Sequence, residues 1–335
     1  MARVEKETSK SLIQHVQRIL EERSSSALKI AKQKMLQQRI RSKEINAALE
    51  HYIRNWMDIT HPGLLSIACE AAGGDSKQSI PIQVVMLLLT AGIDIHDDII
   101  DESQTKYGKP TVLAKFGREI ALLVGDAFLM KALLLLHEQE TQLSKKKRDD
   151  IWSLIGSRFF ELGDAEALEA SLKGKMNITP EDALKILMMK AATFDAHMRI
   201  GAIVGGGNQD VVDLLGNYGR VLGALLCVRE EFIDVFEPEE LANRARNECL
   251  PLPILYAFKN PHAKRAILNS LSKPKISSAD AEKIVEIVFD DENVKTLRNK
   301  IAELVEEGCA NLQNLPDDPL KLQMETLIRG VIGDL

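Results

Sequence analysis

The length, composition and charge of this chain exclude several classes of protein. Its 335 residues suffice for one large domain or two smaller ones, and a net charge of −6 without a long basic block argues against a nucleic-acid partner. Apolar residues recur at helical spacing almost everywhere, while alternating strand patterns are nearly absent. The sequence therefore predicts an all-α protein, and because no convincing linker divides it, we expect a single domain over residues 1–335.

The cysteines and the apolar segments predict the cellular compartment. Four cysteines lack metal or disulfide spacing and are typical of a reduced intracellular protein: Cys69, Cys227, Cys249 and Cys309. Residues 1–17 have no apolar core and so do not form a secretory signal. Gln83, Thr90 and Asp94 interrupt the longest apolar stretch, so we expect no transmembrane segment. The sequence therefore predicts a soluble cytoplasmic protein.

The predicted elements begin with two or three amphipathic helices between about Glu5 and Asn55. A loop and a short buried helix follow over residues 56–74, and a glycine pair ends this helix. The next helix, from Ile80 onward, is apolar over too much of its circumference for a surface helix. It ends in five carboxylates: Asp94, Asp97, Asp98, Asp101 and Glu102.

Downstream of these carboxylates the pattern remains helical. A turn at residues 108–111 leads into a second apolar helix that reaches Asp126, and residues 144–150 are expected to form an exposed connection. Thr179 and Pro180 mark another helix start, with acidic residues near its positive end. Further helices are expected around residues 151–173, 180–204, 211–235 and 252–335, the last with a polar joint at residues 272–280.

The acidic end of the Ile80 helix is the first candidate site. Asp97 and Asp101 are four residues apart and share one helix face, with Asp98 on the same flank. Like charges at the end of a buried helix repel one another, and a bound Mg²⁺, which prefers carboxylate oxygens and shares its shell with phosphates, would explain them. The alternative interpretation is a solvated helix end.

A second acidic set repeats the spacing of the first. Glu230, Glu231 and Asp234 end the helix expected over residues 211–235. Two such helices packed in one bundle would place two carboxylate triads at one end of a shared cavity, an arrangement that suits two or three Mg²⁺ ions around a diphosphate. Two unrelated solvated helix ends remain the alternative.

A series of motifs over residues 56–258 carries a family resemblance. It comprises HDDIIDES followed by GKPT, then LLVGDAFL, Lys190 with its following helix, YGRVLG and LPILYAF. With this series the chain resembles the trans-isoprenyl diphosphate synthases. The resemblance implies an isoprenoid-synthase-type helical bundle around a deep apolar cavity, usually dimeric.

The resemblance also implies the chemistry. Mg²⁺ bound by both acidic motifs draws diphosphate off an allylic prenyl diphosphate, and isopentenyl diphosphate attacks the allylic cation in a head-to-tail condensation. The implied metal ligands are Asp97, Asp98, Asp101, Glu230, Glu231 and Asp234. The implied catalytic residues are Asp97, Asp98, Asp101 and Lys190.

The residues implied to set product length are Gly92 and Ile93. In the family, bulky side chains four or five positions before the first aspartate form the floor of the cavity. Glycine at position 92 would leave the cavity open for long products, although it could equally serve close helix packing. His96 could contact a metal-bound water, and a helix-capping or core role is the alternative.

The chain departs from the family where isopentenyl diphosphate is held. The family's Gly-Gly-Lys-Arg-x-Arg-Pro segment corresponds to residues 56–62, which lack all three cations and carry Asp58 instead. The family's arginine pair before GKPT is replaced by Lys106 and Tyr107. Each lost charge-assisted hydrogen bond costs about 1.5–3 kcal/mol, so we expect weak binding of isopentenyl diphosphate by this chain alone.

The second acidic motif departs as well. Glutamates replace its first two aspartates, Arg229 directly precedes them and is expected to neutralise the pair, and Cys227 stands at the family's glutamine. Cys249 replaces a lysine before the Leu-Pro step, and the family's Lys-Thr pair survives only as Lys190–Ala191.

Three interpretations follow. We favour a subunit of a heteromer in which a complete synthase supplies the isopentenyl diphosphate site; a homodimer is the other expected assembly. The second is a self-sufficient prenyltransferase whose phosphate ligands are rearranged: Lys106, Lys109, Arg118 and Lys190. The third is another diphosphate chemistry such as terpene cyclisation. A non-catalytic interaction subunit is the further alternative.

Overall fold

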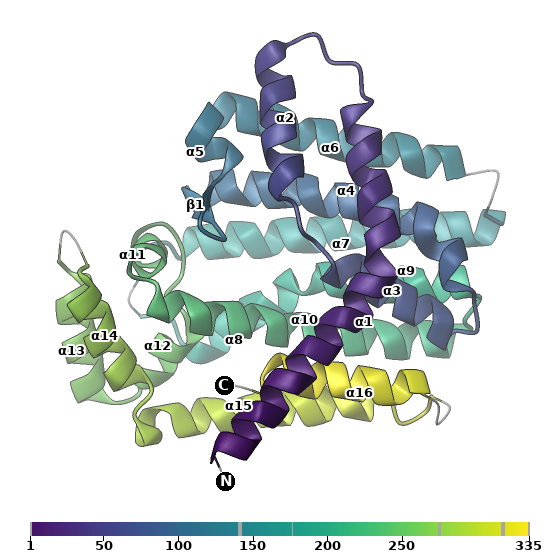
Figure 1. Ribbon diagram of the computed structural model, residues 1–335. Helices are drawn as coiled ribbons and strands as arrows, with labels where there is room; N and C mark the ends of the chain where they lie inside the picture. Colours follow the sequence, from purple (N-terminus) through teal and green to yellow (C-terminus); the bar gives the residue numbers. More distant parts are fainter. Residues whose placement is uncertain (1, 140–142, 176, 274–275, 316–318, 334–335) are drawn as a thin grey trace.

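The computed structural model describes residues 2–139, 143–175, 177–273, 276–315 and 319–333. Within these residues, sixteen helices pack around a shared hydrophobic core, and the strands are confined to one antiparallel pair of two residues each (Figure 1). The predicted all-α fold is confirmed.

The elements follow one another in this order. The first part of the chain forms α1 (Ala2–Leu36), α2 (Lys43–Asn55), α3 (Thr60–Ala71), α4 (Ser76–Ile100), β1 (Thr105–Lys106), β2 (Lys109–Pro110), α5 (Val112–Phe116), α6 (Arg118–Glu138) and α7 (Lys145–Ser171). The second part forms α8 (Pro180–Lys190), α9 (Ala192–Gly205), α10 (Gln209–Phe236), α11 (Pro238–Asn247), α12 (Leu252–Ala257), α13 (Pro261–Leu271), α14 (Ser278–Val288), α15 (Asp291–Ala310) and α16 (Pro319–Val331).

Most predicted helices are present, and two expectations were wrong. The expected connection at residues 144–150 is the first turn of α7, because the Ser144 side chain caps the helix by accepting a hydrogen bond from the Lys147 N–H. The helix expected over residues 180–204 is divided at Ala191 into α8 and α9. Both parts lie against α7 and α10, but α9 also packs on α3 and α4, whereas α8 also packs on α12.

The helix α4 carries the first acidic set at its C-terminal end. The Asp75 side chain caps its start by accepting a hydrogen bond from the Lys77 N–H, and from Ile82 to Ile99 most of its residues are buried. The helix ends at Ile100, and the N–H of the following residue, Asp101, donates to the Asp97 carbonyl oxygen. The negative end of the helix dipole therefore coincides with three carboxylates, an arrangement that a cation would stabilise.

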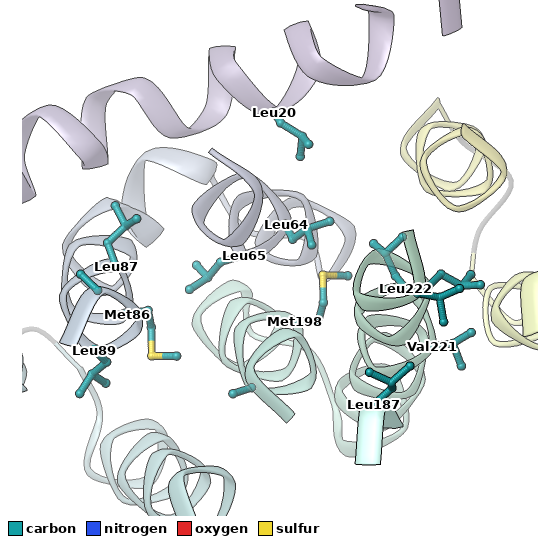
Figure 2. Packing of buried hydrophobic residues seen from close by; sticks show 14 of the residues in the cluster. Leu20, Leu64, Leu65, Met86, Leu87, Leu89, Leu187, Met198, Val221 and Leu222 are labelled. Atoms are coloured by element: carbon teal, nitrogen blue, oxygen red, sulfur yellow. The ribbon is translucent and has the colours of Figure 1, made fainter. Parts of the chain in front are cut away.

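The core lies where α1, α3, α4, α9 and α10 meet. Figure 2 shows Leu64 and Leu65 of α3 beside Met198 of α9, with Leu222 of α10 on one side and Leu87 of α4 on the other. The helix α9 approaches α3 closely because position 201 is glycine, where a Cβ would lie 2.3 Å from the Leu65 carbonyl oxygen. This packing holds α4 and α10, the two acidic helices, in one bundle.

Three helices are long and apolar enough to cross a membrane by length and composition: α4, α6 and α10. Composition alone therefore does not support the expected absence of a transmembrane segment. The apolar windows of α4 and α10 are 67% and 61% buried within the protein, whereas that of α6 is only 39% buried. Packing in the bundle accounts for most of the apolar surface of α4 and α10, and α6 leaves an apolar face exposed.

Candidate active site

The first acidic set is crowded and partly buried. Asp98 and Asp101 are 6% and 7% exposed, and the Oδ1 atom of Asp97 is buried with no hydrogen-bond partner in the described structure. Burial raises the pKa of Asp98 to about 7, although Lys106 opposes the change. Burial and the neighbouring Asp97 raise the pKa of Asp101 to about 8. These carboxylates lack sufficient positive charge around them in the protein itself.

Lys106 is the cation nearest to this set. A tight turn brings it there, with Tyr107 at a positive φ of 52° followed by Gly108. The Lys106 Nζ atom pairs with the Asp94 carboxylate and lies 3.7 Å from Asp98 Oδ1. Burial disfavours its charge, but these carboxylates raise the pKa of Lys106 well above its usual value. Lys106 therefore stays protonated and neutralises one flank of the first set.

Lys190, at the end of α8, reaches the site from the other direction. Its Nζ atom pairs with Glu169 of α7 and lies 3.2 Å from Glu166 Oε1. Burial opposes its charge, while Asp97 and these glutamates raise the pKa of Lys190 well above its usual value. Lys190 therefore lies near enough to Asp97 to interact electrostatically with it, and two further buried carboxylates lie beside it.

The second acidic set is bound by an arginine that the sequence analysis did not single out. Arg244 of α11 donates from Nε and Nη2 to Asp234 Oδ2 at 3.0 and 2.9 Å, and from Nη1 to Glu231 Oε1 at 3.4 Å. The other oxygen of Glu231 accepts the backbone N–H of Leu252 at 2.8 Å. Burial raises the pKa of Glu231 to about 7, although Arg244 and the Leu252 N–H oppose the change.

The expectation that Arg229 neutralises the second set was wrong. Its Nη1 atom donates to the carbonyl oxygen of Val331, at the end of α16, at 2.7 Å. Arg229 lies one position before Glu230 on α10, so its side chain leaves the helix in another direction. The cation that reaches the second set comes instead from the following helix.

The helix α11 contacts both acidic helix ends, because its Arg244 pairs with Asp234 of α10 and its Asn243 reaches the end of α4. Asn243 of α11 donates to the Asp101 carbonyl oxygen at 3.2 Å and to Glu248 Oε1 at 2.7 Å, and so connects the end of α4 to α11. In Figure 1, α11 and β1 lie on the same side of the bundle. Residues from both acidic helices therefore contribute to one site.

The two sets fit a metal ion differently. Within the residues that the structure describes, no three His, Cys, Asp or Glu side chains are already arranged to hold one. The first set nevertheless fits Mg²⁺, because Asp97 Oδ1 is a buried carboxylate oxygen without a partner. In the second set Glu231 and Asp234 are bonded to Arg244, and only Glu230 is exposed. That set does not fit a metal ion.

A histidine cluster occupies the segment that carries cations in the resembled family. His61 Nδ1 lies 3.0 Å from Asp58 Oδ2, and the His61 ring stacks on Phe194 at 4.3 Å and lies 4.7 Å from His197. Burial opposes ionisation of both partners, but their mutual attraction raises the pKa of His61 and lowers that of Asp58. Asp58 pairs with His61 Nδ1, while His61 Nε2 is buried without a hydrogen-bond partner in the described structure. Residues 56–62 contain no arginine or lysine to offer a diphosphate.

The other predicted phosphate ligands lie at the surface. Lys109 Nζ donates to Asn55 Oδ1 at 3.1 Å, and Arg118 lies 3.9 Å from Glu102. Both basic side chains are exposed, and no contact that the structure describes brings either to the buried carboxylates. Of the four predicted phosphate ligands, the structure places Lys106 and Lys190 at the acidic sets.

The two predicted chain-length residues face different neighbours. A Cβ on Gly92 would lie 2.7 Å from Leu129 Cγ and 2.9 Å from the Gly125 carbonyl oxygen of α6, so this glycine allows close helix packing. Ile93 lines an apolar cavity of about 40 Å³ between α4, α7 and α9, together with Leu89, Phe159 and His197 among others. His96 also faces α6, 3.4 Å from Asp126.

Sequence reasoning missed the cation of the second set and the buried carboxylates beside Lys190. These residues are Arg244, Glu248, Glu166 and Glu169. The available signal was the i,i+4 pair of Arg244 and Glu248, in a segment between the helices predicted over residues 211–235 and 252–335. Which face of that segment would be buried could not be read from spacing.

The fold and the site define a class of protein: an all-α bundle that presents two acidic helix ends beside a largely apolar interior. A family model described as Polyprenyl synthetase matches residues 42–288, and the chain belongs to this family. The family and its transferase class, predicted from the motifs, are confirmed.

Individual relatives are similar over most of the chain. The chain is 26% identical over 266 residues to the geranylgeranyl diphosphate synthase of Methanosarcina mazei, covering 78% of this chain and 80% of that protein. It is 25% identical over 268 residues to the octaprenyl diphosphate synthase of Escherichia coli, covering 77% and 80%. The structure of geranylgeranyl pyrophosphate synthetase from Pyrococcus horikoshii superposes with a TM-score of 0.81 at 20% identity, covering 94% of this chain and 98% of that chain, and shows the shared fold.

Proposed function

We propose that this protein is a prenyltransferase that extends an allylic prenyl diphosphate with isopentenyl diphosphate in a head-to-tail condensation. The single observation that carries the proposal is the first acidic set, whose Asp97 Oδ1 is buried without a partner at the end of the apolar helix α4. Mg²⁺, when bound there, supplies the positive charge that assists departure of diphosphate. The names of the relatives, all prenyl diphosphate synthases, support the same substrate class.

The residues around the first set have separate tasks in this proposal. Asp97, Asp98 and Asp101 hold the metal, and Lys190 and Lys106 keep positive charge beside a departing diphosphate. The apolar side chains of Leu89 and Ile93 exclude water, which protects an allylic cation from premature hydrolysis, and the cavity of about 40 Å³ that they line has to widen to take a hydrocarbon tail.

We further propose that the chain works as a subunit of a heteromer with a complete synthase of the same family. Residues 56–62 offer the Asp58–His61 pair where isopentenyl diphosphate requires cations. The helix α6 also exposes a row of apolar side chains suited to a partner helix: Leu122, Leu123, Met130 and Leu134. A cytoplasmic location is part of the proposal, and the four free cysteines are consistent with a reducing compartment.

An elongation assay tests this function. Labelled isopentenyl diphosphate, Mg²⁺ and farnesyl or geranylgeranyl diphosphate are supplied to this protein alone, and then together with a complete synthase from the same cell. We expect no product from the protein alone, and a longer product from the mixture than the complete synthase makes by itself. Product from the protein alone would overturn the heteromer, whereas absence of any effect in both settings would overturn the prenyltransferase.

A further inference from the structure

Arg244 is the most heavily paired cation at the site. Besides Glu231 and Asp234 of α10, its Nη1 atom lies 3.2 Å from Glu248 Oε2 and 3.9 Å from Glu169 Oε1. Its side chain is only 14% exposed. Burial disfavours the charge, but the four carboxylates raise the pKa of Arg244 well above its usual value, and guanidinium is protonated at any physiological pH.

Both carboxylates of the second set that contact Arg244 already accept hydrogen bonds. Asp234 Oδ2 accepts from both Nε and Nη2, while Glu231 uses one oxygen for Arg244 and the other for the Leu252 N–H. Mg²⁺ requires near-octahedral oxygen ligands at short distance. To bind it through either Glu231 oxygen or through Asp234 Oδ2, the protein would have to break these hydrogen bonds, and the divalent ion would lie beside a buried guanidinium.

The first set offers the opposite situation. Lys106 pairs with Asp94, and the shortest distance from its Nζ atom to the first set is 3.7 Å, to Asp98 Oδ1. Asp97 Oδ1 has no hydrogen-bond partner in the described structure. A cation is therefore hydrogen-bonded to Glu231 and Asp234 of the second set, whereas at the first set Lys106 and Lys190 leave Asp97 Oδ1 without a hydrogen bond.

We propose that Arg244 is a permanent internal cation that takes the place of metal at the second acidic set, so that metal binds through the first set alone. Glu231 and Asp234 are then positioning residues for Arg244 rather than metal ligands. This inference rests on the proposed function, because both concern the same site. It predicts fewer bound metal ions per chain than two competent acidic sets would hold.

Mn²⁺ binding in the presence of inorganic diphosphate tests the inference without any turnover. Electron paramagnetic resonance counts free and bound Mn²⁺ for the wild-type chain and for Asp97→Asn, Glu231→Gln and Asp234→Asn. We expect Asp97→Asn to weaken binding at least tenfold, and we expect Glu231→Gln and Asp234→Asn to retain the wild-type number of ions with affinity within about threefold. Circular dichroism verifies that each variant is folded.

Arg244→Gln provides the complementary measurement. Once the guanidinium is removed, Glu231, Asp234 and Glu248 lose their paired cation, while Glu169 keeps Lys190, so we expect the folded variant to bind at least one additional Mn²⁺. Arg246→Gln, on the same helix but with an exposed side chain, is the matched control and should leave the count unchanged.

The outcomes separate the inference from the proposed function. Loss of a bound ion in Asp234→Asn or Glu231→Gln overturns the inference and leaves the prenyltransferase intact. Absence of Mn²⁺ binding by the wild-type chain overturns both. If Arg244→Gln does not fold, the two carboxylate variants, which retain Arg244, decide the question.

Discussion

The ends of α4 and α10 carry acidic sets of the same spacing but differ in the charge that surrounds them. After α4 the chain turns through β1 and brings one ammonium, Lys106, to the edge of the set. After α10 the chain folds back as α11 and inserts Arg244 among the carboxylates. Buried carboxylates require a counter-charge, and Arg244 is hydrogen-bonded to Glu231 and Asp234, whereas Asp97 of the first set keeps an oxygen without a hydrogen bond for a ligand. Equal spacing in sequence therefore does not make two sites equal.

The largest expected effect comes from removing the internal cation. Arg244→Met should lower the free energy of unfolding by about 3–5 kcal/mol, because it leaves buried carboxylates without a partner. Urea denaturation followed by circular dichroism measures the loss. Arg246→Met, with its exposed side chain, should stay within about 0.5 kcal/mol of the wild type. A loss below about 1 kcal/mol in Arg244→Met would mean that the second set does not depend on this cation.

The next effect concerns activity and contrasts the two sets directly. In the mixture with a complete synthase, Asp97→Asn should lower formation of the longer product by about 100- to 1,000-fold, because charge stabilisation at the leaving group is lost. Asp234→Asn should lower it less than about tenfold, since Arg244 remains with three other carboxylates. Equal losses in a steady-state assay of the two variants would show that both sets hold metal.

The pH dependence of stability tests whether the imidazole of His197, which lines the cavity beside α4, is neutral in the folded protein. Burial, and then the neighbouring His61, lowers the pKa of His197 from 6.5 to about 3. The unfolded chain therefore binds this proton near pH 6.5 and the folded protein does not, so the contribution to stability is complete above pH 6.5 and declines as the pH falls toward 3. Between pH 6.5 and 4.5 the loss should be about 2–3 kcal/mol.

The variant His197→Gln isolates that contribution. Its amide N–H can still reach the Thr193 carbonyl oxygen, which accepts from His197 Nδ1 at 2.6 Å. Free energies of unfolding measured for both proteins from pH 7 to 4.5 should converge as the pH falls. Parallel curves would show that His197 is protonated in the folded state.

The smallest effect tests how α4, and with it the first set, is anchored. Gly92→Ala places a Cβ against Leu129 and the Gly125 backbone of α6, so we expect a destabilisation of about 1–3 kcal/mol by thermal unfolding. Gly156→Ala is the control, because no atom lies within 4 Å of a Cβ there and alanine favours the helix by about 0.5–1 kcal/mol. Tolerance of alanine at position 92 would contradict the packing role and favour the alternative, in which this glycine leaves the cavity open.

Local patterns in the sequence were sufficient for the fold class and for half of the site. Helical spacing predicted an all-α chain, and the Asp97–Asp98–Asp101 set with its GKPT turn indicated the family. The capping residue Ser144 was read as part of a loop because its charged neighbours look solvated, although their N–H groups begin α7. Arg229 was given a role that belongs to Arg244, since adjacency in sequence is not adjacency in space.

The sequence by itself determined what each helix carries: the apolar body of α4, the two acidic ends with their common spacing, and the loss of cations over residues 56–62. Only the tertiary structure decided which charges meet. Arg244, Lys190 and Glu169 come from three different helices, and their pairing depends on how those helices pack. Periodicity fixes the face of one helix, whereas the neighbour across that face is chosen by the packing of the whole core.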